Sequence, residues 1–125
     1  MKKITLALAA LAASSAHALT GNISAGKQAF APCAECHQVG PEARSGFGPQ
    51  LNRLFGRRAG SSPDYKYSKA MMNATIVWQE RTLAEFIKNP DRTVPGTRMR
   101  FLSFGYDEQK IVDLLAYLRT FDTPH

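Results

Sequence analysis

Apolar residues near the C-terminus repeat at the spacing of one helix face. They fall at positions i, i+3, i+4 and i+7, namely Ile111, Leu114, Leu115 and Leu118. Asp107 precedes them as a candidate N-cap, and Arg119 suits the negative end of a helix. The pattern predicts a helix between these two charged residues, with its apolar face in the core.

Three shorter stretches also favour helices. The first is expected over about Ser24 to Ala31, with Ser24 as its N-cap. The second follows Ser68 through Met72, and the third covers about Thr82 to Lys88 with Asn89-Pro90 as its stop. No segment alternates long enough to demand a strand, so the sequence predicts an all-α protein.

Two long stretches have little periodicity and are rich in Gly, Pro and Ser. They run from Val39 to Ser62 and from Asn89 to Tyr106. Loops longer than about 12–15 residues are uncommon in compact domains unless they wrap something or perform a function. Something other than side chains is therefore expected to fill the centre of this fold.

The N-terminal residues form a secretory signal pattern. Lys2 and Lys3 precede an apolar stretch from Ile4 to Ala13, and Ala16-His17-Ala18 is a small-x-small cleavage site. The apolar stretch is too short to span about 30 Å of hydrocarbon. We expect residues 1–18 to be a signal peptide, cleaved after Ala18, and residues 19–125 to form one domain.

Composition supports a single ordinary globular domain. The chain has 125 residues, 10% aromatic and 21% charged, which argues against disorder, and it has no repeats. Loss of Lys2 and Lys3 would lower the net charge from +6 to +4. An exported protein rarely meets nucleic acid, so the positive charge favours a partner with an acidic protein surface.

The candidate chemistry lies in Cys33-Ala34-Glu35-Cys36-His37, which is the C-x-x-C-H pattern of covalent c-type haem attachment. Each thiol would add across a haem vinyl group, and two intervening residues let one helical turn reach both vinyls. The imidazole of His37, which directly follows Cys36, would bind the iron through a ring nitrogen.

Three other interpretations compete with haem. A thiol–disulfide centre is expected near a βαβ pattern, which is not present. A zinc site needs four ligands and would have to recruit His125. A disulfide between Cys33 and Cys36 would close a very short loop and constrain the unfolded chain little. Two features favour haem. The long loops are expected to surround something other than side chains, and the N-terminus carries an export signal.

A haem iron also needs a sixth ligand, and a thioether stabilises the reduced iron. Met71 and Met72 lie in an expected helix, where core packing is the simpler role. Met99 follows the turn-rich run Pro95-Gly96-Thr97-Arg98. Residue chemistry alone prefers Met99 only slightly.

From Gly26 to Leu118 the chain resembles the class I c-type cytochromes, closest to mitochondrial cytochrome c and small bacterial cytochromes. The matching segments are Gly26-Lys27-Gln28-Ala29-Phe30, Cys33-Ala34-Glu35-Cys36-His37, Gly48-Pro49-Gln50-Leu51, Leu54-Phe55-Gly56-Arg57, Tyr65-Lys66-Tyr67-Ser68, Trp78, Asn89-Pro90, Pro95-Gly96-Thr97-Arg98-Met99 and Leu114-Leu115-Ala116-Tyr117-Leu118. The resemblance implies a small cytochrome c fold of four to five short helices, with long loops wrapped around one covalent haem c.

The resemblance also implies roles for single residues. Cys33 and Cys36 would hold the haem, His37 and Met99 would be the axial ligands, and the Pro49 carbonyl would accept a hydrogen bond from the imidazole. Five residues match positions that hold the haem propionates: Arg57, Tyr67, Ser68, Trp78 and Thr97. Gly26 and Phe30 of the first helix would cross Leu114 and Tyr117 of the last.

The function that the resemblance implies is one-electron transfer between redox proteins in a bacterial periplasm, and no enzymatic activity. The protein would act as a monomer on partners with acidic docking surfaces, without nucleic acid and without stable membrane insertion. Arg98, Arg100, Phe101 and nearby lysines would form the rim of the docking site. Two alternatives remain: a haem subunit of a larger dehydrogenase or sulfur-oxidising complex, or a peroxidase-like or sensor protein with an open iron site.

Overall fold

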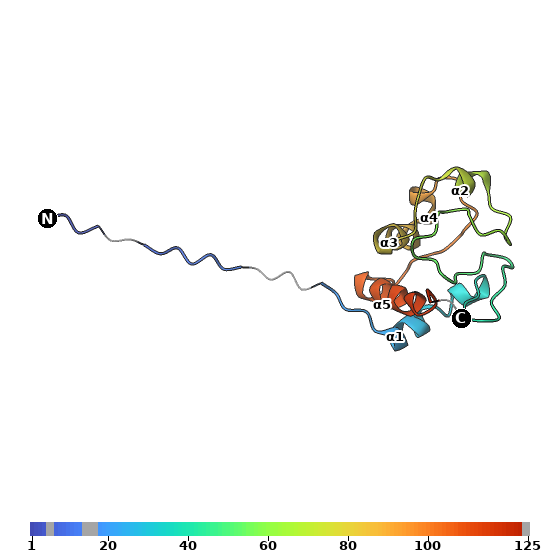
Figure 1. The fold of residues 1–125 in the computed structure, drawn as a ribbon, viewed down its shortest axis with the longest axis horizontal. Coiled ribbons are helices and arrows are strands. Elements are labelled where there is room, and N and C mark those ends of the chain that lie inside the picture. The colour runs from blue at the N-terminus through green and yellow to red at the C-terminus, as the bar shows by residue number, and fades with distance from the viewer. Residues whose placement is uncertain (5–6, 14–17, 124–125) are drawn as a thin grey trace.

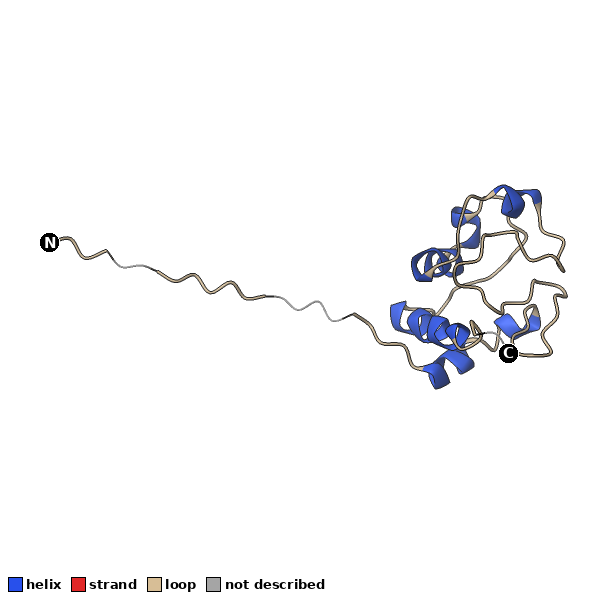
Figure 2. Cartoon of the chain, viewed as in Figure 1, coloured by secondary structure: helices blue, strands red, loops and turns tan. Residues whose placement is uncertain are grey.

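The structure is a computed structural model that describes residues 1–4, 7–13 and 18–123. Its elements, in chain order, are α1 (Ile23–Ala29), a 3₁₀ turn η1 (Cys33–Glu35), α2 (Lys69–Asn73), α3 (Glu80–Lys88), α4 (Pro90–Thr93) and α5 (Glu108–Arg119). Across the described residues the only β-pairing is an isolated bridge between Arg58 and Val77. The predicted all-α class is confirmed, and loops make up much of the domain (Figure 2).

The first and last helices pack directly on each other (Figure 1). A Cβ atom at Gly26 would lie 1.9 Å from the Asp113 carbonyl oxygen, so only glycine allows this approach. Beside it, the rings of Phe30 and Tyr117 lie 5.5 Å apart. The predicted crossing of the two terminal helices is therefore present.

A buried carboxylate joins the start of α1 to α5. Asp113 accepts hydrogen bonds from the Asn22 amide at 2.8 Å and from the Gln109 side chain at 2.9 Å. The Gln109 amide also donates to the Thr20 carbonyl at 3.0 Å. Because buried carboxylates need hydrogen-bond donors, these contacts fix where the folded domain begins, at about Thr20.

The core is continuous and lies between α1, α3, α5 and the loops that connect them. Within the part of the chain that the structure describes, its buried apolar residues are Ala29, Phe30, Leu54, Ala59, Trp78, Leu83, Phe86, Ile87, Val94, Ile111, Leu114, Leu115 and Leu118. Helix α3 contacts both α4 and α5. At the surface, Arg119 of α5 reaches Glu80 of α3 at 2.8 Å.

The predicted Ser24 cap is wrong, whereas the predicted stop of the third helix at Asn89-Pro90 is confirmed and has a second role. Helix α1 begins at Ile23 and is capped by the Asn22 side chain, not by Ser24, because Asn22 accepts from the Ala25 amide at 2.8 Å. Asn89-Pro90 ends α3 but also begins α4, since Asn89 accepts from the Arg92 amide at 3.0 Å. The stretch from Asn89 to Tyr106 is therefore not wholly loop.

The described N-terminal residues, 1–4 and 7–13, lie away from the domain (Figure 1). Residues 1–4 and 7–13 form no helix and are exposed. Three of the four residues just before the predicted cleavage point lie outside the described residues, at positions 15–17. No helix among the described residues is both long and apolar enough to cross a membrane.

Candidate functional site

The two cysteines lie on one tight turn that continues from α1. The Cys33 amide donates to the Phe30 carbonyl at 2.8 Å, and the His37 amide donates to the Cys33 carbonyl at 2.8 Å. This second bond closes one turn over the whole motif, so Cys33, Cys36 and His37 project from a single rigid segment. All three side chains are half-buried, and Cys33 packs against the core.

His37 is held by the loop that follows the motif. Its Nδ1 atom lies 2.7 Å from the Pro49 carbonyl oxygen, which can only accept, so Nδ1 carries the proton. Burial lowers the pKa of His37, while the bond to Pro49 opposes that shift. The imidazole is therefore neutral at neutral pH, and its Nε2 lone pair is available to a metal.

Gly48 lies against the same imidazole and was not among the predicted site residues. A Cβ atom there would lie 2.7 Å from His37 Cε1, and the Gly48 amide donates to the Cys36 carbonyl at 2.9 Å. The Gly48-Pro49 pair is a turn signal in the sequence, but nothing in it indicates which side chain the turn contacts. Gly48 leaves the space that the imidazole ring occupies.

The Cys33 thiol does not have the properties of a metal-binding or redox thiol. Burial raises the pKa of the Cys33 thiol to about 11, so that sulfur is a neutral thiol rather than a reactive thiolate at neutral pH. No cluster of three His, Cys, Asp or Glu side chains that could hold a metal occurs within residues 1–4, 7–13 and 18–123. The zinc alternative needed His125, which lies outside those residues.

Arg57 is a half-buried cation whose hydrogen bonds go only to carbonyls. Its guanidinium donates to the backbone carbonyl of Asn52 at 3.2 Å and to that of Gln50 at 3.1 Å. It forms no ion pair with the described residues. Burial lowers its pKa, and the nearby Tyr67 and Asp64 oppose the shift. Such a cation fits a carboxylate of a bound group.

The structure joins only some of the other predicted polar residues to Arg57. The Trp78 amide donates to the Arg57 carbonyl at 2.9 Å, and its side chain is buried against Phe86. Ser68 instead caps α2 by accepting from the Met71 amide at 3.1 Å. Thr97, only 2% exposed, accepts from the Met99 amide at 3.3 Å. Neither Ser68 nor Thr97 contacts Arg57 through a described hydrogen bond.

Burial separates the three candidate methionines. Met72 is 48% exposed, whereas Met71 and Met99 are half-buried and pack against the core. Met99 lies in the segment between α4 and α5, and its neighbour Arg98 donates to the Lys66 carbonyl at 2.6 Å. Met71 and Met99 are thus the two thioethers turned toward the interior.

The residues present fit a covalently attached haem: a rigid dithiol turn, a neutral imidazole with a free nitrogen, inward thioethers and a half-buried cation. These features define a c-type haem protein. Comparison with known proteins agrees, since a family model described as Cytochrome c matches residues 23–122. The chain belongs to the cytochrome c family.

Individual relatives are similar over most of their length. Cytochrome c2 of Blastochloris viridis is 42% identical and covers 98% of this chain and 95% of its own. Cytochrome c of Cannabis sativa is 41% identical, and the match covers 79% of this chain and 89% of that protein. The solved structure of cytochrome cH from Methylobacterium extorquens has a TM-score of 0.73 and 36% identity, covering 80% of this chain and 99% of its own.

Family membership sets the broad chemistry. The protein is a monohaem electron carrier and not an enzyme, and its haem c is bound through the two cysteines at positions 33 and 36.

Proposed function

We propose that this chain is a periplasmic one-electron carrier whose haem iron is held between His37 and Met99. The observation that carries the proposal is the Cys33–His37 turn, on which Pro49 fixes a neutral imidazole directly after two thiols. When bound, haem supplies an iron that accepts and releases one electron at a time.

The protein's own residues would keep the ligands and charges of this centre fixed. The hydrogen bond from His37 Nδ1–H to the Pro49 carbonyl leaves Nε2 free, would orient it toward a bound haem iron and would make the imidazole a stronger donor. A Met99 thioether stabilises the reduced state. Arg57, Tyr67, Ser68, Trp78 and Thr97 would surround the haem propionates, with Arg57 supplying the charge. The surrounding core excludes water, which lowers the reorganisation that accompanies electron transfer.

We further propose that residues 1–18 are a signal peptide and that the mature protein is residues 19–125. The folded domain begins at about Thr20, where the Gln109 side chain first holds the backbone. Cleavage after Ala18 would therefore remove only residues that precede the first long-range hydrogen bond of the domain. Export to the periplasm follows from this signal.

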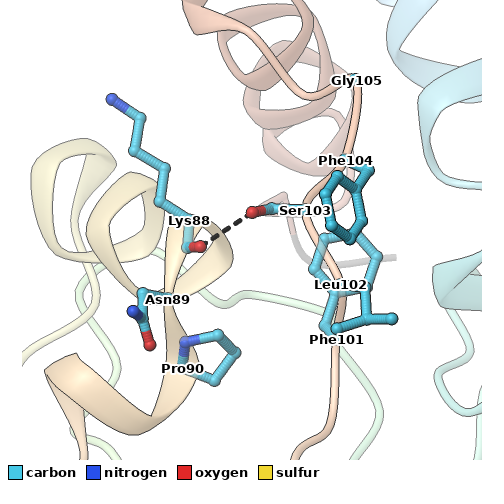
Figure 3. Close-up of a pocket in the computed structure, with 8 residues that line it drawn as sticks. All are labelled: Lys88, Asn89, Pro90, Phe101, Leu102, Ser103, Phe104 and Gly105. Carbon is cyan, nitrogen blue, oxygen red and sulfur yellow. Dashed lines mark hydrogen bonds between the residues drawn. The ribbon is translucent and has the colours of Figure 1, made fainter.

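The proposed docking surface combines an apolar groove with positive charge. The groove has a volume of about 460 Å³ and lies between the end of α3 and the segment after Met99 (Figure 3). Leu102 and Phe104 are 78% and 86% exposed, and Lys88 lines the groove. Arg98 and Arg100, both exposed, flank Met99. An acidic redox protein with an apolar centre fits this surface, and the encounter would be small and short-lived.

Ionic strength tests this function. Oxidation of the reduced holoprotein by the anion hexacyanoferrate(III), which stands in for an acidic partner, should slow as salt increases, because salt screens the attraction. Arg100→Glu should lower the low-salt rate constant, whereas Arg81→Glu on α3, with the same change in net charge, should lower it much less. Stopped-flow absorbance measures these rates.

A rate constant that does not vary with salt, or that falls equally in both variants, would contradict the docking surface. Failure of the reduced protein to transfer an electron at all would contradict the carrier function.

A further inference from the structure

A tyrosine in the segment after Met99 is tied to the far end of the sequence. The Tyr106 hydroxyl donates a hydrogen bond of 2.7 Å to the carbonyl oxygen of Ala29. Ala29 is the last residue of α1 and is 3% exposed. The bond therefore joins the segment that carries Met99 to the helix that leads into the cysteine turn.

The Ala29 carbonyl depends on this bond. The last carbonyls of a helix have no partner within the helix and need one elsewhere. The backbone amides that follow α1 donate to Gln28, Gly26 and Phe30 rather than to Ala29. Since Ala29 is buried, water is a poor substitute, and loss of the tyrosine hydroxyl would leave a buried acceptor unsatisfied.

The Tyr106 ring also contacts two neighbouring side chains. Its centroid lies 5.1 Å from that of Phe101 in an edge-on contact, and the Lys110 ammonium lies 4.2 Å above it. Burial raises the pKa of the Tyr106 hydroxyl, so it remains a protonated donor at neutral pH. The donor is thus held in place by its neighbours.

The other side-chain hydrogen bond described for residues 101–106 is more exposed. Leu102 and Phe104 are exposed, and the Ser103 hydroxyl donates to the Lys88 carbonyl at 2.8 Å in an exposed position (Figure 3). Water can replace an exposed bond at little cost, so the Ser103 contact restrains the segment less. The Tyr106 hydroxyl makes the partly buried hydrogen bond at the end of this segment, just before α5 begins at Glu108.

We propose that Tyr106 is a positioning residue, which holds the segment from Met99 to Tyr106 against α1 and thereby keeps the Met99 sulfur at the iron. This inference rests on the proposed role of Met99 as an axial ligand. Local opening of the segment would begin with rupture of the Tyr106–Ala29 bond, and detachment of the sulfur would follow.

Tyr106→Phe tests the proposal, because it removes the hydroxyl and keeps the ring. Tyr117→Phe is the matched control. Tyr117 is half-buried on α5, its ring packs at a tilt against that of Phe30, and its hydroxyl has no hydrogen bond among the described residues. The rate of hydrogen–deuterium exchange of the backbone amides of residues 101–106 measures how readily the segment opens. We expect about tenfold faster exchange in Tyr106→Phe, the size expected for one lost bond to a buried acceptor.

The sulfur-to-iron charge-transfer band of the ferric protein reports whether the Met99 sulfur is bound to the iron. In Tyr106→Phe this band should disappear at a lower temperature than the helical circular dichroism, and added imidazole should bind about tenfold faster. Ser103→Ala should change the temperature at which the band disappears and the rate of imidazole binding less than Tyr106→Phe does. Tyr117→Phe should change neither quantity relative to the unmodified protein.

Equal exchange and equal band stability in Tyr106→Phe and Tyr117→Phe would overturn the positioning role of Tyr106 while leaving Met99 as the ligand. Absence of the charge-transfer band from the unmodified ferric protein would instead overturn the ligand assignment. Hydrogen exchange would still show whether Tyr106 restrains the segment. The two failures are therefore distinguishable.

Discussion

Met99→Ala is expected to abolish the ferric sulfur-to-iron charge-transfer band, lower the reduction potential and let the ferrous protein bind carbon monoxide readily. A thioether stabilises ferrous iron, so its loss favours the ferric state, and the vacated position admits small ligands. The fold should survive, because Met99 is only half-buried and lies outside the helices. Absorbance spectroscopy and a redox titration measure the three effects.

The other two methionines are matched controls for this result. Met71→Ala removes a thioether that also packs against the core, and Met72→Ala removes an exposed one. Both variants should keep the charge-transfer band, although Met71→Ala should lose some stability, as a truncated core side chain does. Loss of the band in Met71→Ala alone would assign the ligand to Met71. Fast carbon monoxide binding by the unmodified protein would favour the open-site alternative.

Gly26→Ala is expected to destabilise the protein by at least about 3 kcal/mol, at the upper end of the cost of overpacking. Helix propensity alone predicts the opposite sign, since alanine is better than glycine inside a helix by up to about 1 kcal/mol. The new Cβ would lie 1.9 Å from the Asp113 carbonyl oxygen and 2.8 Å from the Tyr117 Cβ. Backbone atoms cannot rotate away, so α1 and α5 must separate.

Denaturant unfolding, followed by helical circular dichroism, measures the loss. Gly46→Ala is the control, because a Cβ atom there meets nothing within 4 Å. It should change the free energy of unfolding by less than about 0.5 kcal/mol. Equal stability of the two variants would show that the α1–α5 contact does not limit the fold.

The sequence predicts the elements whose determinants are local. The apolar spacing and the Asp107 cap define α5 correctly, and the structure places Glu108–Arg119 there with Asp107 accepting from the Lys110 amide. The C-x-x-C-H motif likewise predicts a single turn. Asn22 was missed as the α1 cap because Ser24 is an equally suitable cap residue, and the choice depends on a contact with Asp113 of α5.

Contacts that depend on tertiary structure cannot be predicted this way. Gly48 is important because of the imidazole beside it, and Tyr106 because of a carbonyl 77 residues away in the sequence. Neither has a local pattern that marks its partner. Ser68 and Thr97 illustrate the reverse. Their family positions suggest ligand contacts, while their side-chain hydroxyls accept hydrogen bonds from the backbone amides of Met71 and Met99.

The measurement that tests the central claim most directly is the mass of the intact polypeptide, purified from the periplasm and fully denatured. The account predicts the mass of residues 19–125 plus one haem, with the colour retained after extraction with acidified acetone. The variant with both Cys33→Ala and Cys36→Ala should release any colour. A denatured chain without haem mass and with two titratable thiols would contradict the account.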